Sequence, residues 1–197
     1  DCASFKLIEE LSNGDFKKII VSTGATFDRE IEKTVAILKK NNQLFTLLHC
    51  VSIYPTPLEE AHLNRLKYLK SLNDSIGISD HSNYDLYGPK LSLTSVFCGA
   101  TIVEKHFTIL DKKKTKDGIV SANPKELKEL ARLCKLPKTQ QENYISENIP
   151  EFSNIMLGKS NRELSDTELL NRDYYQGRFA SFSKSKHPIY NWEDKEI

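Results

Sequence analysis

Two short polar motifs in the sequence each place a histidine directly after an apolar run. Ser79-Asp80-His81 follows one run and Glu104-Lys105-His106 ends the next. Neighbouring parallel strands lie about 4.8 Å apart, so two histidines at the same height could share one metal ion. Imidazole suits Mn, Fe, Co or Zn, with water, carboxylate or substrate at the open positions. Asp117, in the loop that follows, could add an oxygen ligand or bind substrate. Alternatively, both histidines form structural hydrogen bonds at the edge of a sheet.

Three serines, Ser22, Ser52 and Ser79, follow three consecutive apolar runs. Hydroxyls and main-chain N–H groups that converge at the mouth of a barrel can bind phosphate, particularly beside helix N-termini. Serine is also a common turn and capping residue, and the pattern alone favours that second interpretation.

Other reactive side chains have simpler explanations. His49 and Cys50 are neighbours on a predicted strand, so they point to opposite faces and cannot both reach one site. We expect Cys50 in the core or the barrel interior, and His62 and His187 at the surface. The run from Asp111 to Lys116 is most simply a solvated loop, with a basic lid over an anionic substrate as the alternative.

The elements that must position these residues alternate between short apolar runs and longer amphipathic ones. The strand ends fall near Gly24, Cys50, Ser79 and His106, at intervals of 26, 29 and 27 residues. The predicted strands are Lys18–Val21, Thr46–Cys50, Ser75–Ser79 and Thr101–Phe107. The predicted helices are Phe27–Lys40, capped by Thr26 or Asp28, then Pro57–Leu72, Leu86–Phe97, and one from Asn123-Pro124 to about Cys134.

Four βα units at an even period predict an α/β fold with a parallel sheet. We interpret them as half of a (β/α)8 TIM barrel, with a flavodoxin-like open sheet as the alternative. Polar residues end every predicted strand, which favours the barrel because its strand ends meet at one mouth. Four units cannot close a barrel, so we expect these to be strands five to eight, with four more before Asp1.

The predicted domain organisation has two parts. Residues 1–135 form the C-terminal half of the barrel, and residues 136–197 form a linker and a partial C-terminal extension. The stretch from Leu136 to Glu151 is polar and is predicted to be a linker or surface segment. Aromatic residues between Asn161 and Ile197 are compatible with short strands of a small appended module.

The composition excludes several classes of protein. The 197 residues are 39% hydrophobic and 28% charged, with a formal net charge of +1, which gives no electrostatic case for nucleic-acid or membrane binding. No apolar run of about 18 residues occurs, and the first residues lack the pattern of a signal peptide. The four cysteines are widely spaced and indicate reduced thiols in a cytoplasmic protein.

Five motifs occur together in one order and spacing. They are Ser22-Thr23-Gly24, LHCVSIYPTP from Leu48 to Pro57, GISDHS from Gly77 to Ser82, VEKHFT from Val103 to Thr108, and SANP from Ser121 to Pro124. Over roughly residues 1 to 135 the chain resembles the sialic acid synthase family, which makes N-acetylneuraminate and related nonulosonic acids. The resemblance implies a (β/α)8 barrel, usually followed by an antifreeze-like domain that reaches the active site of a partner subunit in a homodimer. Arg178 to Ser181 only loosely resembles the start of that domain.

The resemblance also assigns a metal and a phosphoenolpyruvate pocket. His81 and His106 match the family's two metal-binding histidines, and the cofactor would be Mn²⁺ or Mg²⁺. Ser22, Ser52 and Ser79 match positions that line the phosphoenolpyruvate pocket. The family often has Asn at the position of Ser52, so that contact would be shorter or bridged by water.

Further residues are assigned to the amino sugar and to proton transfer. By resemblance, Tyr54 and Asp117 lie near the sugar and Glu104 lies beside phosphoenolpyruvate, and Glu104 and Asp117 are candidates to handle protons. Asp1 matches a sugar-binding carboxylate. A rival alignment, which needs a deletion, places Lys6 on that acid instead.

The implied reaction condenses phosphoenolpyruvate with an N-acetylmannosamine-like aldehyde and releases phosphate. Two alternatives stay open. One is another metal-dependent aldolase on the same barrel. The other is a truncated or split-gene half-barrel that is inactive alone.

Overall fold

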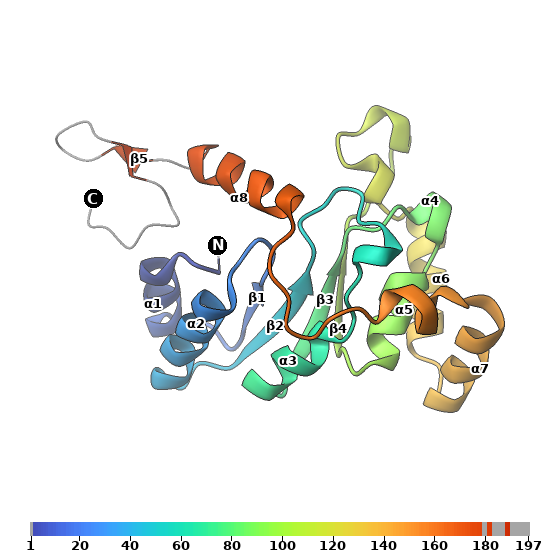
Figure 1. The fold of residues 1–197 in the computed structure, drawn as a ribbon, viewed down its shortest axis with the longest axis horizontal. Helices are drawn as coiled ribbons and strands as arrows, with labels where there is room; N and C mark the ends of the chain where they lie inside the picture. The colour runs from blue at the N-terminus through green and yellow to red at the C-terminus, as the bar shows by residue number, and fades with distance from the viewer. Residues whose placement is uncertain (1, 179–180, 183–187, 190–197) are drawn as a thin grey trace.

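A computed structural model describes residues 2–178, 181–182 and 188–189 of the chain (Figure 1). In this part, a curled parallel sheet of four strands is packed against helices. The strands of this sheet are β1 (Ile19–Ser22), β2 (Phe45–Cys50), β3 (Ile76–Asp80) and β4 (Ile102–Lys105). The longer helices are α1 (Phe5–Asn13), α2 (Asp28–Lys40), α3 (Arg65–Leu72), α5 (Lys90–Phe97), α6 (Pro124–Cys134), α7 (Lys138–Asn148) and α8 (Asp166–Arg178). The shorter elements are η1 (Leu58–Glu60), α4 (Tyr84–Tyr87), η2 (Lys112–Lys114), η3 (Gly118–Val120), the π-helical η4 (Phe152–Met156), β5 (Ser181–Phe182) and β6 (Pro188–Ile189).

The strand order of the sheet is β1-β2-β3-β4, and every pair is parallel. This sequential order is that of a barrel wall, whereas a doubly wound open sheet reverses its order at a switch point. The prediction of an α/β fold with four parallel strands in half-barrel order is confirmed. The numbering of the strands as five to eight stays a prediction.

The hydrophobic core lies between the sheet and the helices. Val21, Leu47 and Ile76 pair in register across β1, β2 and β3, and all three are buried. They belong to the same cluster as Ile31 of α2 and Leu66 of α3. Side chains alternate along a strand, so the other set of residues on these strands faces the concave side of the sheet.

Two predicted helices are each divided by a residue with positive φ. The prediction of one helix over Pro57–Leu72 is wrong, because His62 has φ 44° and separates η1 from α3. The prediction over Leu86–Phe97 is likewise wrong, because Gly88 has φ 55° and separates α4 from α5. A left-handed residue cannot continue a right-handed helix.

The starts of α2 and α6 share one contact, a glutamate carboxylate that accepts from the main-chain N–H three residues before it. Asn123 caps α6, where its side chain accepts from the Glu126 N–H at 3.0 Å and the Glu126 carboxylate accepts from the Asn123 N–H at 2.8 Å. In α2 the Glu30 carboxylate accepts from the Phe27 N–H at 2.9 Å. Neither Thr26 nor Asp28 is therefore the cap that we predicted.

The polar segment after Cys134 is a helix rather than the predicted linker. α7 buries Gln141 and Ile145, and Gln141 donates to the carbonyl oxygens of Cys134 and Leu136 at the end of α6. Ile145 joins Leu133 in the core cluster. The helix was missed because so few of its residues are apolar. The domain boundary at residue 135 stays a prediction.

Among the described residues after Asn161, the main element is α8, which the sequence did not predict. Residues 181–182 and 188–189 form a short antiparallel pair, β5 with β6, which agrees with the expectation of short strands. Trp192 and His187 lie outside the described residues.

Candidate active site

Two adjacent strands bring the histidine motifs to the same height. Ser79 pairs with Glu104 and Asp80 pairs with Lys105 across β3 and β4. Because side chains alternate, Ser79 and Glu104 face the concave side, whereas Asp80 and Lys105 face the helices. The Ser79 hydroxyl donates to the Glu104 carboxylate at 2.5 Å. His81 is therefore the residue that extends the concave row at the carboxyl end of the sheet.

The two predicted metal-binding histidines lie together. The ring centroids of His81 and His106 are 5.3 Å apart, with an edge-to-face geometry. Tyr54 completes the group, with its ring centroid 4.1 Å from that of His81 and 6.2 Å from that of His106. We call the carboxyl edge of the sheet the mouth. Three motifs that are far apart in the sequence therefore meet at one point of the mouth.

The surroundings of His81 suit a metal ligand. Its Nδ1 lies 3.3 Å from the carbonyl oxygen of Val51, which can only accept a hydrogen bond. The proton of the neutral ring therefore belongs on Nδ1, and the lone pair of Nε2 faces the Ser79 hydroxyl oxygen at 3.4 Å. A carbonyl partner on the other ring nitrogen is usual for metal-bound imidazole. Burial lowers the pKa of His81 to about 4, which keeps the ring neutral at pH 7.

His106 occupies a more open position. Its side chain is 34% exposed, and its Nδ1 lies 4.0 Å from the carboxylate of Asp117, which is itself 52% exposed. That distance is too long for a hydrogen bond. Within the described residues, no group of three or more His, Cys, Asp or Glu side chains is gathered as a metal site. The two imidazoles would supply two ligands, and water or substrate oxygen would have to supply others.

Cys50 links the serines to the histidines. Its thiol interacts with the hydroxyls of Ser22 and Ser52, and its Sγ lies 3.8 Å from Nδ1 of His81. Burial raises the pKa of Cys50, so the thiol stays protonated. On the opposite face of β2, His49 contacts the Ala61 carbonyl oxygen at 2.8 Å. As predicted, the two neighbours do not share a site.

The structure places most of the predicted site residues in one region. Ser79, Glu104, His81, His106 and Tyr54 form its centre. Ser22 and Ser52 reach it through Cys50, and Asp117 lies at its margin. Asp1 lies outside the described residues, so its predicted role stays a prediction.

Two other expectations need revision. His62 is not a simple surface residue, since its side chain is 18% exposed and contacts Glu60 and the Lys159 N–H. In the basic run, Lys112 forms ion pairs with Asp85 and Glu126, whereas Lys113 and Lys114 are exposed as expected for a solvated loop.

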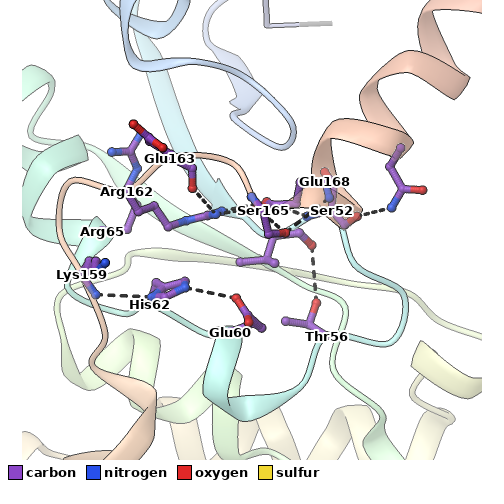
Figure 2. Close-up of polar contacts among 12 residues, drawn as sticks. Ser52, Thr56, Glu60, His62, Arg65, Lys159, Arg162, Glu163, Ser165 and Glu168 are labelled. Carbon is purple, nitrogen blue, oxygen red and sulfur yellow. Dashed lines mark hydrogen bonds and ion pairs between the residues drawn. The ribbon is translucent and has the colours of Figure 1, made fainter.

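The sequence analysis missed a group of residues around Ser52. Figure 2 shows Arg162, Ser165 and Glu168 gathered beside Ser52, although more than 100 residues separate them in the chain. The only signal was the Ser165-x-x-Glu168 spacing of a capping box, which indicates a helix start. It does not indicate the contact with Ser52.

No helix among the described residues has both the length and the apolar character needed to cross a membrane.

Known proteins resemble this chain over most of its length. N,N'-diacetyllegionaminic acid synthase of Campylobacter jejuni is 41% identical over 118 residues, which cover 58% of this chain and 34% of that protein. N-acetylneuraminate-9-phosphate synthase of Drosophila melanogaster is 31% identical over 151 residues, which cover 72% of this chain and 39% of that protein. The chain therefore spans well under half the length of these two relatives.

Solved structures agree with these relatives. The N-acetylneuraminic acid (sialic acid) synthetase of Leptospira borgpetersenii superposes with a TM-score of 0.61 at 34% identity, over 88% of this chain and 54% of that one. The spore coat polysaccharide biosynthesis protein SpsE of Bacillus subtilis gives a TM-score of 0.71 at 25% identity, over 88% and 48%. The model of the NeuB family matches residues 1–143. The chain is therefore a member of the NeuB family.

Proposed function

We propose that the chain forms half of the active site of a synthase that condenses phosphoenolpyruvate with an N-acetylmannosamine-like amino sugar. The product would be a sialic acid-type nonulosonic acid, with release of phosphate. The observation that carries the proposal is the meeting of His81, His106 and Tyr54 with the Ser79–Glu104 pair at one end of a parallel sheet. The ends of barrel strands are where TIM-barrel enzymes place their active sites.

His81 and His106 would hold a divalent metal, either Mn²⁺ or Mg²⁺. Imidazole ligands fit Mn²⁺ better, because Mg²⁺ prefers oxygen. The neutral state of His81 and the orientation of its Nδ1 toward the Val51 carbonyl support this assignment. Such a metal would polarise the aldehyde oxygen of the sugar as a Lewis acid.

Ser22, Ser52 and Ser79 would line the phosphoenolpyruvate pocket and hold the enol carbon near the aldehyde carbon. The pair Ser79–Glu104 is pre-organised, because the Ser79 proton is already donated to Glu104. The Ser79 oxygen is then left as an acceptor, so Ser79 would contact a donor or a water rather than the phosphate itself while that bond persists. Ser22 and Ser52 are the better phosphate donors.

The reaction forms one carbon–carbon bond and one carbon–oxygen bond to water, and it breaks the carbon–oxygen bond to phosphate. The enol carbon attacks the aldehyde carbon, and positive charge develops at the carbon that bears the phosphate. Water adds to that carbon, a base removes its proton, and phosphate leaves. Glu104 and Asp117 would serve as the base and as the acid that protonates the new hydroxyl. Tyr54 would contact the sugar, and Asp1 would bind it as a carboxylate. We also propose a homodimer and a cytoplasmic location.

Phosphate release from phosphoenolpyruvate tests the proposal. The assay would contain N-acetylmannosamine and Mn²⁺, with the chain alone and with the chain joined to the four preceding βα units of a relative. We expect release in the joined protein that requires both the sugar and the metal and is lost in His81→Ala. If the joined protein binds Mn²⁺ but leaves phosphoenolpyruvate intact with N-acetylmannosamine, its 6-phosphate, and legionaminate and pseudaminate precursors, the proposed reaction is wrong.

A further inference from the structure

Helix α8 is not part of the βα units, but it contacts the loops that follow β1 and β2 at the mouth. Glu168, Asn171 and Arg172 have the i, i+3, i+4 spacing that places side chains on one face of a helix. All three contact the loops that follow β1 and β2. We call this group of three residues the clasp.

The clasp holds both polar main-chain groups of Ser52. The Ser52 N–H donates to Oε1 of Glu168 at 3.3 Å, and the Ser52 carbonyl oxygen accepts from Nδ2 of Asn171 at 2.5 Å. The Ser52 hydroxyl lies close to Gly24 and interacts with the Cys50 thiol. A Cβ added at Gly24 would lie 2.6 Å from that hydroxyl oxygen.

The same face of α8 holds the loop after β1. Arg172 donates to the Ala25 carbonyl oxygen at 2.7 Å and pairs with the Glu30 carboxylate at 2.7 Å. Ala25 has φ 49°, an uncommon conformation for a residue with a side chain, which persists only when the surroundings fix it. Arg172 is one of those surroundings, and it is itself only 7% exposed.

Glu168 has more contacts than a helix cap requires. Its Oε2 accepts from the Ser165 N–H at 3.1 Å, which completes a capping box. Its other oxygen, Oε1, accepts from Ser52 and, at 2.7 Å, from Arg162. Glu168 is fully buried. Burial alone would raise the pKa of Glu168, but the hydrogen bonds and charge of Arg162 lower it below its usual value, so the carboxylate is ionised.

We propose that Glu168, Asn171 and Arg172 are positioning residues, which fix the loops after β1 and β2 so that the hydroxyls of Ser22 and Ser52 face the mouth at a constant separation. All three act through other residues, because they contact Ser52, Ala25, Glu30, Arg162 and Ser165. Their expected effect on phosphoenolpyruvate binding rests on the proposed function. Their expected effect on the Ser52 main chain is independent of the proposed function.

Two variants separate the clasp from the helix cap. Glu168→Gln keeps a capping box, because Gln serves as well as Glu at that position, but it removes the negative charge. Asn171→Ala removes the hold on the Ser52 carbonyl and leaves the capping box untouched. The control is Ile145→Ala, which changes a buried core residue of α7. This helix lies at the opposite end of the molecule from β1 and α8 (Figure 1), so the variant lowers stability away from the clasp.

The first readout is amide hydrogen exchange at Ser52 in the 197-residue chain. The second is the KM for phosphoenolpyruvate in the joined protein described above, with Mn²⁺ affinity measured alongside. In Asn171→Ala we expect Ser52 to exchange faster by about tenfold, the scale of one hydrogen bond. In Glu168→Gln the increase should be larger, because this change also leaves the buried Arg162 without its counter-charge. The KM should rise by a similar factor, with a smaller change in kcat and unchanged Mn²⁺ affinity.

Unchanged Ser52 exchange in both variants overturns the proposal. So does an equal rise of exchange and KM in Ile145→Ala at the same loss of melting temperature, because the effect would then be general destabilisation. If wild-type protein shows no phosphoenolpyruvate binding while Ser52 exchange responds as expected, the clasp is supported and the proposed function is the part that fails.

Discussion

Asp80 and Lys105 form a buried ion pair on the convex side of the same two strands whose next residues are His81 and His106. The Lys105 Nζ lies 3.0 Å from Oδ1 of Asp80, and the two side chains are 2% and 1% exposed. The Asp80 carboxylate also accepts from Ser82 at 2.6 Å and from Ser92 of α5 at 2.5 Å. The pair therefore links the carboxyl ends of β3 and β4 to each other and, through Ser92, to α5. These contacts lie one residue before His81 and His106.

The first prediction removes the cation of this pair. Lys105→Met should destabilise the fold by about 3–5 kcal/mol, because it leaves a buried carboxylate without its counter-charge. Urea unfolding would measure the loss. The variant should also bind Mn²⁺ more weakly, since the strand ends that carry His81 and His106 are no longer fastened together.

An exposed ion pair provides the control. Arg132 and Glu129 of α6 form a 2.7 Å pair with side chains that are 57% and 49% exposed. Arg132→Met should leave the unfolding curve unchanged, because solvent screens such pairs. If Lys105→Met and Arg132→Met unfold at the same urea concentration as the wild type, the Asp80–Lys105 pair does not fasten the strand ends.

The strands were predictable because of their burial. Every residue of β2 and β3 is buried, so each strand reads as a short apolar run, and the predicted bounds differ from the observed ones by one residue. The fourth strand of the parallel sheet, β4, was predicted too long, as Thr101–Phe107 rather than Ile102–Lys105. Phe107 instead forms an isolated bridge with Ala122 in the loop, and no local pattern distinguishes a bridge from a strand.

The clasp was not predictable, for a different reason. Asn171 reaches Ser52 across 119 residues of chain, and Arg172 reaches Ala25 across 147. Both are ordinary polar residues on a helix whose own pattern is weakly amphipathic. Their burial depends on the path of the chain after η4, where the Leu63 and Asn64 N–H groups donate to the Met156 and Leu157 carbonyls. A polar contact between residues more than 100 positions apart leaves no local sequence pattern, so it can be identified only from the structure.

The second prediction concerns the metal. His81→Ala and His106→Ala should each weaken Mn²⁺ binding by more than the roughly 10–100-fold that loss of an outer partner costs. Isothermal titration with MnCl₂ would measure it. His62→Ala is the matched control, because His62 contacts Glu60 and Lys159 rather than the mouth. Equal affinity in all three variants and the wild type would remove the metal from the proposed site.

The third prediction tests how tightly the two serine-bearing loops approach each other. In Gly24→Ala the new Cβ would lie 2.6 Å from the Ser52 Oγ and 2.7 Å from the Cys50 Sγ. We expect a loss of about 1–3 kcal/mol in unfolding free energy from overpacking. Combining it with Cys50→Ala should recover part of that loss, because the double variant gives the new methyl group room. Additive losses in a double-mutant cycle would show that the two positions do not press on each other.

The last prediction concerns acid stability and His49, which lies on the opposite face of β2 from the proposed chemistry. Burial lowers the pKa of His49 to about 3, despite the hydrogen bond to the Ala61 carbonyl that favours the charged form. An unfolded chain binds this proton near pH 6.5, and the folded chain does not until about pH 3. Stability should therefore fall as the pH drops through this window, by up to about 1.4 kcal/mol per pH unit for this one group, and should be insensitive to His49 above it.

His49→Gln separates this titration from that of other groups. The Gln side chain keeps an N–H donor for the Ala61 carbonyl but cannot be protonated in this range. Urea unfolding between pH 7 and pH 4 should give a shallower decline for the variant than for the wild type. A residual slope should remain, because burial also lowers the pKa of His81, to about 4. Parallel declines in the two proteins would mean that the His49 ring is protonated in the folded state, and that the packing between β2 and the Ala61 turn opens to water below pH 6.5.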